Sequence, residues 1–191
     1  MPAGVSPAAW SSRSDPIDQQ RILFVCLGNI CRSPLAEGAM RTVAERRGIA
    51  VDVDSAGTGD WHIGRPPDPR AIATGARHGV DISGLRARQV TPGDFHRFDH
   101  IVALDPKNLG DLRRLMPDGA KADLTMLLDH VDGRKGQGVT DPYFGEDEGF
   151  ETAWTDIMTG VEGRFDHFML YESELGATGP TYSVIERYLL V

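Results

Sequence analysis

The sequence predicts an α/β fold built on a parallel sheet, and three observations lead to this prediction. Short apolar runs of strand length alternate along the chain with longer segments that have the pattern of helices. The first such run, residues 21–26, is apolar along nearly its whole length, as is typical of a strand buried on both faces of a parallel sheet. The chain has 191 residues, of which 40% are hydrophobic, enough for a single domain with a proper core.

The expected elements follow one another in a regular order. Residues 33–47 are predicted to form a helix, because Ser33 can cap it, Pro34 suits its first turn and Gly48 ends it. The other expected elements are strand 51–56, helix 69–78, strand 98–104, helix 106–116, strand 123–128 and helix 149–170. Right-handed crossovers then place a ligand site at the carboxyl ends of the strands. The sequence thus predicts a four-stranded parallel sheet with helices on both faces, a flavodoxin-like three-layer sandwich.

The two ends of the chain fall outside this pattern. Residues 1–20 lack the basic start and apolar core of a signal peptide, and they are predicted to form a flexible leader. For the tail, residues 171–191, the sequence predicts no definite structure. We interpret its tyrosines as ordinary surface residues rather than regulatory phosphorylation sites; they are Tyr171, Tyr182 and Tyr188.

Charge and cysteine content exclude several classes of protein. A formal net charge of -8 argues against nucleic acid as the main partner, because a phosphate backbone binds to a basic face. No apolar run reaches the ~20 residues of a membrane span, so no membrane partner is expected. The two cysteines, Cys26 and Cys31, share one loop, whereas a disulfide scaffold or a structural zinc site would need more ligands along the chain. We therefore expect a cytoplasmic protein without a metal or other cofactor.

The loop after the first strand carries the strongest functional signal. Its residues are Cys26, Leu27, Gly28, Asn29, Ile30, Cys31, Arg32 and Ser33. A strand-to-helix loop of this length can wrap a tetrahedral anion with backbone N–H groups at the positive end of a helix dipole, and Gly28 allows close approach or a positive φ. The same field stabilises a thiolate at Cys26, and Arg32 offers a planar fork for two phosphate oxygens. Together these groups are suited to in-line attack on a phosphate monoester without a metal.

The spacing of these residues matters more than their types. A cysteine on a buried strand is usually a small hydrophobic residue, and an arginine that opens a helix is usually a surface charge. A cysteine followed after five residues by Arg-Ser, between an apolar strand and a helix, favours the catalytic interpretation. No Gly-Lys-Ser/Thr sequence is present, so the loop is not a nucleotide-binding P-loop.

The segment 25–34, VCLGNICRSP, resembles the signature loop of low-molecular-weight protein-tyrosine phosphatases nearly letter for letter. The resemblance continues through DSAGT at 54–58, ARHGVDIS at 76–83, the strand at 98–105 and DPYF at 141–144. It implies a phosphatase domain over residues 21–170 that hydrolyses phosphotyrosine through a phosphocysteine at Cys26, with phosphate bound by Arg32. It also implies that Asp141 protonates the leaving phenolate and then activates water.

The same resemblance implies supporting roles and a partner. Asn29 would hold the loop in shape with support from Ser55 and His78, and Ser33 would hydrogen-bond the leaving thiolate. The residues that match positions lining the family's substrate cleft are Trp61, Tyr143 and Phe144. The expected partner is a phosphotyrosine-containing protein, and the enzyme is expected to be a monomer or a weak dimer.

Three alternative functions fit part of the pattern. In protein-arginine phosphatases of the same superfamily, threonine tends to occupy the position of Ile30, whereas isoleucine favours a flat phenyl ring. A thiol-coupled arsenate reductase passes its disulfide to further cysteines, and the sequence has none after Cys31. A non-catalytic phosphate-binding or redox-sensing module would lack one of the three catalytic side chains, and all three are present.

The second thiol has a possible role of its own. A loop that curls around a small anion can bring Cys31 within the Cα separation of about 7 Å that a disulfide with Cys26 requires. We therefore predict that Cys31 protects an oxidised Cys26 by forming a reversible disulfide. The alternative is that Cys31 only fills space under the loop.

Overall fold

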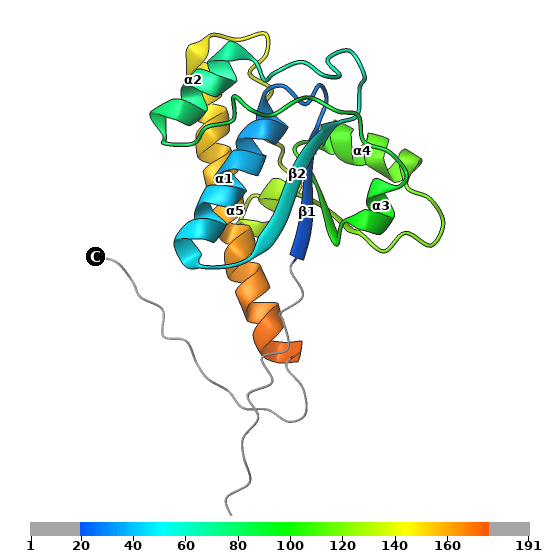
Figure 1. Cartoon of the computed structure of the whole chain (residues 1–191). Helices are drawn as coiled ribbons and strands as arrows, with labels where there is room; N and C mark the ends of the chain where they lie inside the picture. The colour runs from blue at the N-terminus through cyan, green and yellow to red at the C-terminus, as the bar shows by residue number, and fades with distance from the viewer. Residues whose placement is uncertain (1–19, 176–191) are drawn as a thin grey trace, which may run out of the picture.

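Four parallel strands form one sheet at the centre of the molecule (Figure 1). The computed structural model describes residues 20–175, with side chains described up to Arg164. The strands are β1 (Gln20–Cys26), β2 (Val51–Gly57), β3 (His100–Ala103) and β4 (Asp123–Met126). They lie in the order β2-β1-β3-β4, and each neighbouring pair is parallel. The predicted fold class is confirmed.

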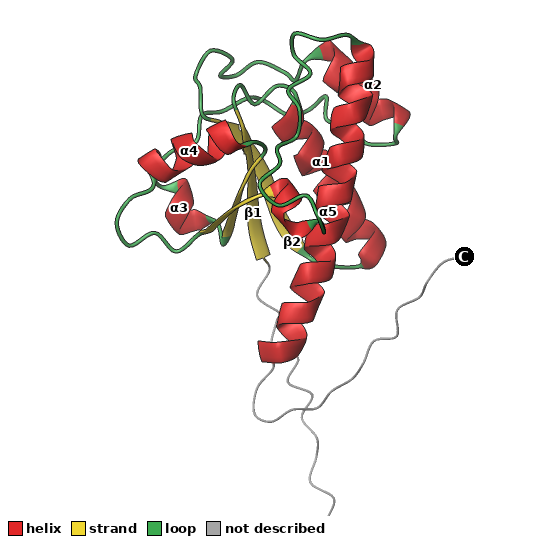
Figure 2. Ribbon diagram, turned by 180° about the vertical axis from the view of Figure 1, so that it is seen from behind, coloured by secondary structure: helices red, strands yellow, loops and turns green. Residues whose placement is uncertain are grey.

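Helices cover both faces of this sheet (Figure 2). On one face lie α1 (Arg32–Arg47), α2 (Pro69–Arg77) and α5 (Asp147–Leu175). On the other face lie α3 (Asp94–Arg97) and α4 (Pro106–Leu115). The sheet is therefore the middle of three layers.

The central strand β1 explains why its sequence is apolar. Successive side chains of a strand point to opposite faces. Ile22 and Phe24 pack in the cluster that includes residues of α1 and α5, whereas Leu23 and Val25 pack in the cluster with residues of α3 and α4. All four are completely buried. Because both faces are covered, no position of this strand has to be polar.

Three regions differ most clearly from the predicted elements. The strand predicted over 123–128 ends at Met126, and Leu127 begins a 3-10 helix, Leu127–His130. The buried Leu127 packs closely on α5, where a Cβ on Gly160 would lie 2.5 Å from its Cγ, so helix packing accounts for its apolar character. The short helix α3 was not predicted, and α5 continues beyond residue 170 to Leu175.

The ends of the chain lie largely outside the described residues. The predicted leader, 1–20, is outside them except for Gln20, which begins β1. Tyr182 and Tyr188 are also outside, whereas Tyr171 falls within α5. Among residues 20–175, no helix is both long and apolar enough to cross a membrane.

Candidate active site

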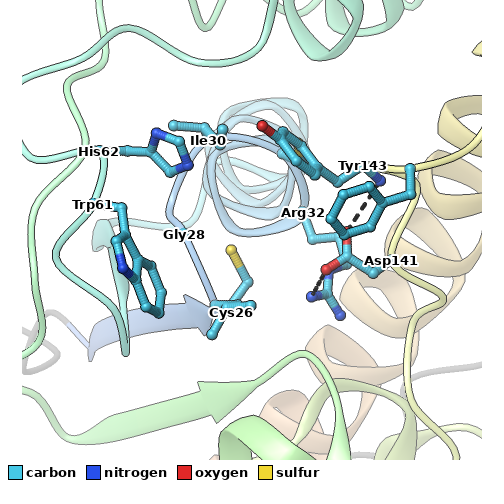
Figure 3. A pocket seen from close by; sticks show the side chains of 11 residues that line it. Cys26, Gly28, Ile30, Arg32, Trp61, His62, Asp141 and Tyr143 are labelled. Carbon is cyan, nitrogen blue, oxygen red and sulfur yellow. Dashed lines mark hydrogen bonds and ion pairs between the residues drawn. The ribbon is translucent and has the colours of Figure 1, made fainter.

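The loop between β1 and α1 forms the floor of the site (Figure 3). Asn29 adopts a left-handed conformation with φ of 55°, which asparagine tolerates better than most other residues with a side chain. Gly28 has a different role, because a Cβ there would lie 3.0 Å from Cδ2 of His62. Close approach therefore explains the glycine, and the positive φ falls on the next residue.

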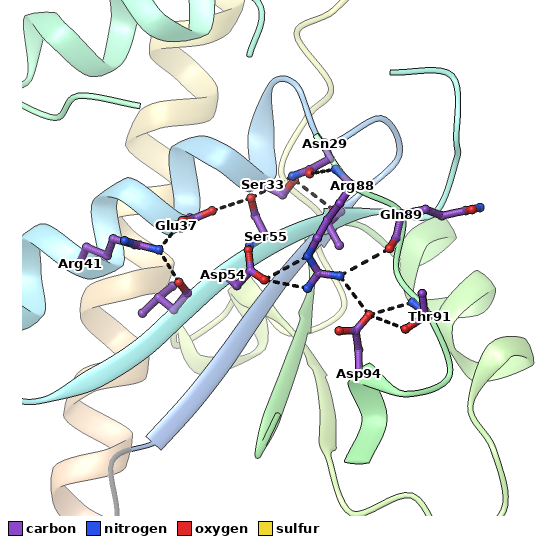
Figure 4. Close-up of polar contacts among 12 residues, drawn as sticks. Asn29, Ser33, Glu37, Arg41, Asp54, Ser55, Arg88, Gln89, Thr91 and Asp94 are labelled. Carbon is purple, nitrogen blue, oxygen red and sulfur yellow. Dashed lines mark hydrogen bonds and ion pairs between the residues drawn. The ribbon is translucent and has the colours of Figure 1, made fainter. Parts of the chain in front are cut away.

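The side chain of Asn29 ties this loop to its surroundings (Figure 4). Its Nδ2 donates to Oγ of Ser33 and to Oγ of Ser55, both at 2.9 Å. Its Oδ1 accepts from the backbone N–H of Arg88 at 2.8 Å. The amide is buried and each of its polar atoms has a partner, so the loop is held where the left-handed turn requires it.

A buried carboxylate beneath the loop sets the direction of these hydrogen bonds. Glu37 of α1 accepts from Oγ of Ser55 at 2.7 Å and pairs with Arg41 at 2.6 Å. Burial raises the pKa of Glu37, while the hydrogen bonds from Ser55 and Arg41 act in the opposite direction. Because Ser55 donates its only hydroxyl proton to Glu37, it must accept from Asn29, which fixes the amide orientation (Figure 4).

The expectation that His78 supports Asn29 is wrong. Nε2 of His78 lies 2.8 Å from Oε2 of Glu151, and its ring stacks on Trp154 with centroids 4.7 Å apart. His78 therefore joins α2 to α5 instead. The third contact of Asn29 comes from the backbone N–H of Arg88, and a backbone donor leaves no side-chain motif in the sequence.

The thiol of Cys26 lies at the bottom of the site with two possible donors. Its Sγ is 3.0 Å from Oγ of Ser33 and 3.3 Å from the backbone N of Asn29. Since Ser33 accepts from Asn29, its own proton is available either to Sγ or to the carbonyl oxygen of Ala56 at 3.2 Å. A thiolate at Cys26 would attract that proton, because charge-assisted hydrogen bonds are the stronger ones.

Arg32 is held by acceptors from distant parts of the chain. Its Nη1 donates to Asp105 at 2.6 Å and to the carbonyl oxygen of Val139 at 3.1 Å, and its Nη2 donates to Asp141 at 2.6 Å. The side chain is almost completely buried. A buried guanidinium with this many acceptors is fixed in direction, as an anion clamp needs to be.

The electrostatic surroundings keep Arg32 charged. Burial disfavours its charge, but the negative groups of Cys26, Asp141 and Asp105 outweigh this and raise the pKa of the guanidinium above its usual value. Its buried Nε has no hydrogen-bond partner among the described residues. An unpaired buried donor is costly, and an oxygen of a bound phosphate would satisfy it.

The sequence-based prediction missed two further residues that shape the site. Asp105 follows β3 and caps α4 by accepting from the N–H of Asn108, and its other oxygen pairs with Arg32. An acidic residue at the carboxyl end of a strand and before Pro106 is a signal that could have found it. Gly57 ends β2, and a Cβ there would lie 2.8 Å from the carbonyl oxygen of Leu27, so only glycine lets the loop pass.

Asp141 reaches the site from the loop that precedes α5. Its Oδ1 accepts from the N–H of Tyr143 at 3.2 Å, and its Oδ2 pairs with Arg32. The Asp141 side chain is 40% exposed, whereas that of Arg32 is 3% exposed. The carboxyl group is thus accessible from the cavity, as a proton donor to a bound molecule has to be.

These groups surround a cavity of about 200 Å³ (Figure 3). It is lined by Cys26, Leu27, Gly28, Ile30, Cys31, Arg32, Trp61, His62, Asp141, Tyr143 and Phe144. Phe144 is 97% exposed and Trp61 is 69% exposed, so aromatic surface faces solvent around the opening. The structure thus brings together all the predicted cleft residues, and His62 is an addition. In the described part of the chain, no group of His, Cys, Asp and Glu is placed to hold a metal ion.

Known proteins match this chain over the segment that carries the site. A family model described as low molecular weight phosphotyrosine protein phosphatase matches residues 21–173. The low molecular weight phosphotyrosine protein phosphatase 1 of Drosophila melanogaster is 45% identical over 141 residues, which are 73% of this chain and 90% of that protein.

Solved structures show the same likeness. The crystal structure of YfkJ from Bacillus subtilis matches with a TM-score of 0.75 and 38% identity, covering 81% of this chain and 97% of that one. The structure of a Drosophila arginine phosphatase matches with a TM-score of 0.73 and 30% identity, covering 77% of this chain and 96% of that one.

Proposed function

The chain belongs to the low-molecular-weight phosphotyrosine protein phosphatase family and is a phosphatase, and we propose that it hydrolyses phosphotyrosine in proteins through a phosphocysteine intermediate on Cys26. The observation that carries this proposal is the meeting of a buried thiol, a fixed guanidinium and a carboxyl group at one cavity. The cytoplasmic location and the monomeric or weakly dimeric state stay predictions.

The proposed reaction has two steps. In the first, the thiolate of Cys26 attacks phosphorus while Arg32 binds the phosphate oxygens, and Asp141 gives its proton to the leaving phenolate. In the second, Asp141 takes a proton from water, which attacks the phosphocysteine and releases the thiolate. Ser33, 3.0 Å from Sγ, is placed to donate to that thiolate.

Aromatic walls favour a phenyl phosphate over an alkyl one. Tyr143 and Phe144 meet edge to face with centroids 4.9 Å apart, and Trp61 also lines the cavity. Exposed aromatic surface at the mouth of a cavity is suited to contact with an aromatic ligand.

The nucleophile is tested by Cys26→Ser. We expect turnover of p-nitrophenyl phosphate in the absence of metal to be abolished, while binding of phosphate or vanadate survives because the loop amides and Arg32 remain. Arg32→Lys should lose binding as well, since an ammonium group cannot reproduce the bidentate fork. Measurable turnover by Cys26→Ser would remove Cys26 from the nucleophile role.

The general acid is tested by Asp141→Asn. For phenyl phosphate, kcat/KM should fall on the order of 10²–10⁴-fold, because the phenolate then leaves without a proton. The loss should be smaller for p-nitrophenyl phosphate, whose leaving group is more acidic and needs less protonation. An equal loss for both substrates would mean that Asp141 only positions its loop.

A second candidate activity is the hydrolysis of phosphoarginine, which the likeness to the Drosophila arginine phosphatase favours. Ile30 separates the two candidates, because it is an apolar residue in the cavity wall, 9% exposed. A polar guanidinium would lose hydration against that side chain, whereas a phenyl ring would not.

We therefore expect Ile30→Thr to lower kcat/KM for phosphotyrosine and raise it for phosphoarginine. Both values should be measured on the same enzyme preparations, with Ile63→Thr as a control for an exposed isoleucine outside the cavity lining. If the ratio of the two values does not change, Ile30 does not select the substrate.

We also infer a protective role for Cys31. Peroxide would convert the Cys26 thiolate to a sulfenic acid, and the Cys31 thiolate could then attack its sulfur, form the disulfide and release hydroxide, which takes up a proton to become water. Burial, followed by the negative groups of Cys26, Asp68 and Asp141, raises the pKa of the Cys31 thiol well above its usual value. Cys31 is therefore protonated at neutral pH, so it does not compete with Cys26 as a nucleophile.

The raised pKa of the Cys31 thiol predicts the direction in which disulfide formation depends on pH. The rate of disulfide formation in peroxide-treated enzyme should increase with rising pH, because the reactive Cys31 thiolate becomes more abundant. Wild-type enzyme should recover its activity with dithiothreitol, and Cys31→Ser should lose much of this recovery while its turnover before oxidation persists. Mass spectra of oxidised enzyme that lack a Cys26–Cys31 link would contradict the role.

A further inference from the structure

An ion pair at the start of α2 joins two loops of the site. Oδ1 of Asp68 caps the helix by accepting from the N–H of Arg70 at 2.8 Å. Nε of Arg70 donates to the same oxygen and Nη2 donates to Oδ2, both at 3.0 Å. The hydrogen bonds from Arg70 lower the pKa of Asp68 despite its partial burial, so the pair is charged at neutral pH. A two-point contact of this kind fixes the plane of the guanidinium.

On one side, this pair is anchored to the phosphate-binding loop. The backbone N–H of Asp68 donates to the carbonyl oxygen of Ile30 at 2.8 Å. Ile30 lies between Asn29, whose side chain holds the loop, and Cys31. The position of the Asp68–Arg70 pair is therefore set by the same loop that carries the nucleophile.

On the other side, Arg70 binds the loop that carries Asp141. Its Nη2 donates to the carbonyl oxygen of Tyr143 and its Nη1 to that of Gly145, both at 3.0 Å. The N–H of Gly145 in turn donates to Pro142 at 3.0 Å, which closes the turn immediately after Asp141. The guanidinium also lies over the ring of Phe150 at the start of α5, 4.7 Å from its centroid.

We propose that Arg70 is a positioning residue for Asp141, holding the loop of the general acid at a fixed place relative to the phosphate-binding loop. Arg70 does not line the cavity, so it acts through Asp141 rather than on the substrate. A displacement of about 1 Å in a reacting group can cost on the order of 10²-fold in rate. The proposal rests on the proposed role of Asp141 as general acid.

A purely structural role is the alternative, and the chain offers a matched control for it. Arg77, at the other end of α2, pairs with Glu151 of α5 at 2.5 Å, and its described contacts do not include the loop that carries Asp141. Arg77→Ala therefore removes an arginine that joins α2 to α5 and leaves the loop that carries Asp141 unchanged. If Arg70 only joined α2 to α5, Arg70→Ala and Arg77→Ala would have the same effect on the kinetics.

The test compares kcat/KM for phenyl phosphate and p-nitrophenyl phosphate in Arg70→Ala. We expect a loss on the order of 10- to 100-fold for phenyl phosphate, a smaller loss for p-nitrophenyl phosphate, and an unchanged inhibition constant for vanadate. Arg70→Lys should lie between wild type and Arg70→Ala, because one ammonium group cannot serve both carbonyls in the same geometry. Arg77→Ala should leave the ratio of the two substrates unchanged.

A double variant gives the decisive comparison. If Arg70 acts through Asp141, adding Arg70→Ala to Asp141→Asn should cause little further loss for phenyl phosphate, whereas independent effects would multiply. Thermal unfolding checks that each variant is folded, and Asp68→Asn, which keeps a cap acceptor, serves as a milder disruption with the same expected trend.

The outcomes also separate this proposal from the one it rests on. If Asp141→Asn depends on the leaving group and Arg70→Ala does not, or if their effects multiply, Arg70 does not position the acid. If Asp141→Asn itself shows no dependence on the leaving group, the general-acid assignment fails, and the role of Arg70 fails with it.

Discussion

The hydrogen bonds of the Asn29 side chain are the constraint on which the rest of the site depends. A left-handed residue with a Cβ costs roughly 1–2 kcal/mol, and each of the three hydrogen bonds contributes about 1 kcal/mol, so the contacts offset the strained turn. The turn brings the N–H of Asn29 to Sγ of Cys26. The same side chain orients the hydroxyl of Ser33, which then faces that sulfur. Asn29 is therefore connected to both polar contacts of the Cys26 thiol.

Arg32 places a second demand on the fold, because its charge has to be kept in a nearly water-free position. A buried charge is tolerated only with partners of opposite sign and satisfied hydrogen bonds. The chain supplies one carboxylate outside the cavity lining, Asp105, and one within it, Asp141. Asp105 also caps α4, so helix formation and the orientation of Arg32 are coupled. Asp105 is thus a partner of Arg32 fixed by its place at the start of α4, whereas Asp141 is a partner that faces the cavity.

The sequence predicted features that arise locally and missed those that arise between distant segments. The apolar β1, the strand–loop–helix pattern around Cys26 and the alternation of elements were enough for the confirmed fold class. The donor to Asn29 could not be found this way, since it is the backbone N–H of Arg88, 59 positions away, and the predicted His78 contacts Glu151 instead. The sequence predicts a strand at Leu127 because a buried leucine has the same pattern in a strand and in a turn packed on a helix.

The floor and the walls of the cavity depend on different kinds of interaction. The floor consists of buried groups whose hydrogen bonds depend on one another, and they connect Glu37 and Ser55 through Asn29 and Ser33 to the thiol of Cys26. The walls consist of exposed aromatic side chains such as Trp61 and Phe144, whose replacement removes contact surface but no buried hydrogen bond. The aromatic walls can therefore vary without disturbing the floor, whereas Ile30 belongs to the same loop as Cys26. Arg70 links the walls to the floor, because it donates to backbone carbonyls of the loop that carries Asp141. These contacts do not depend on which aromatic side chains that loop carries.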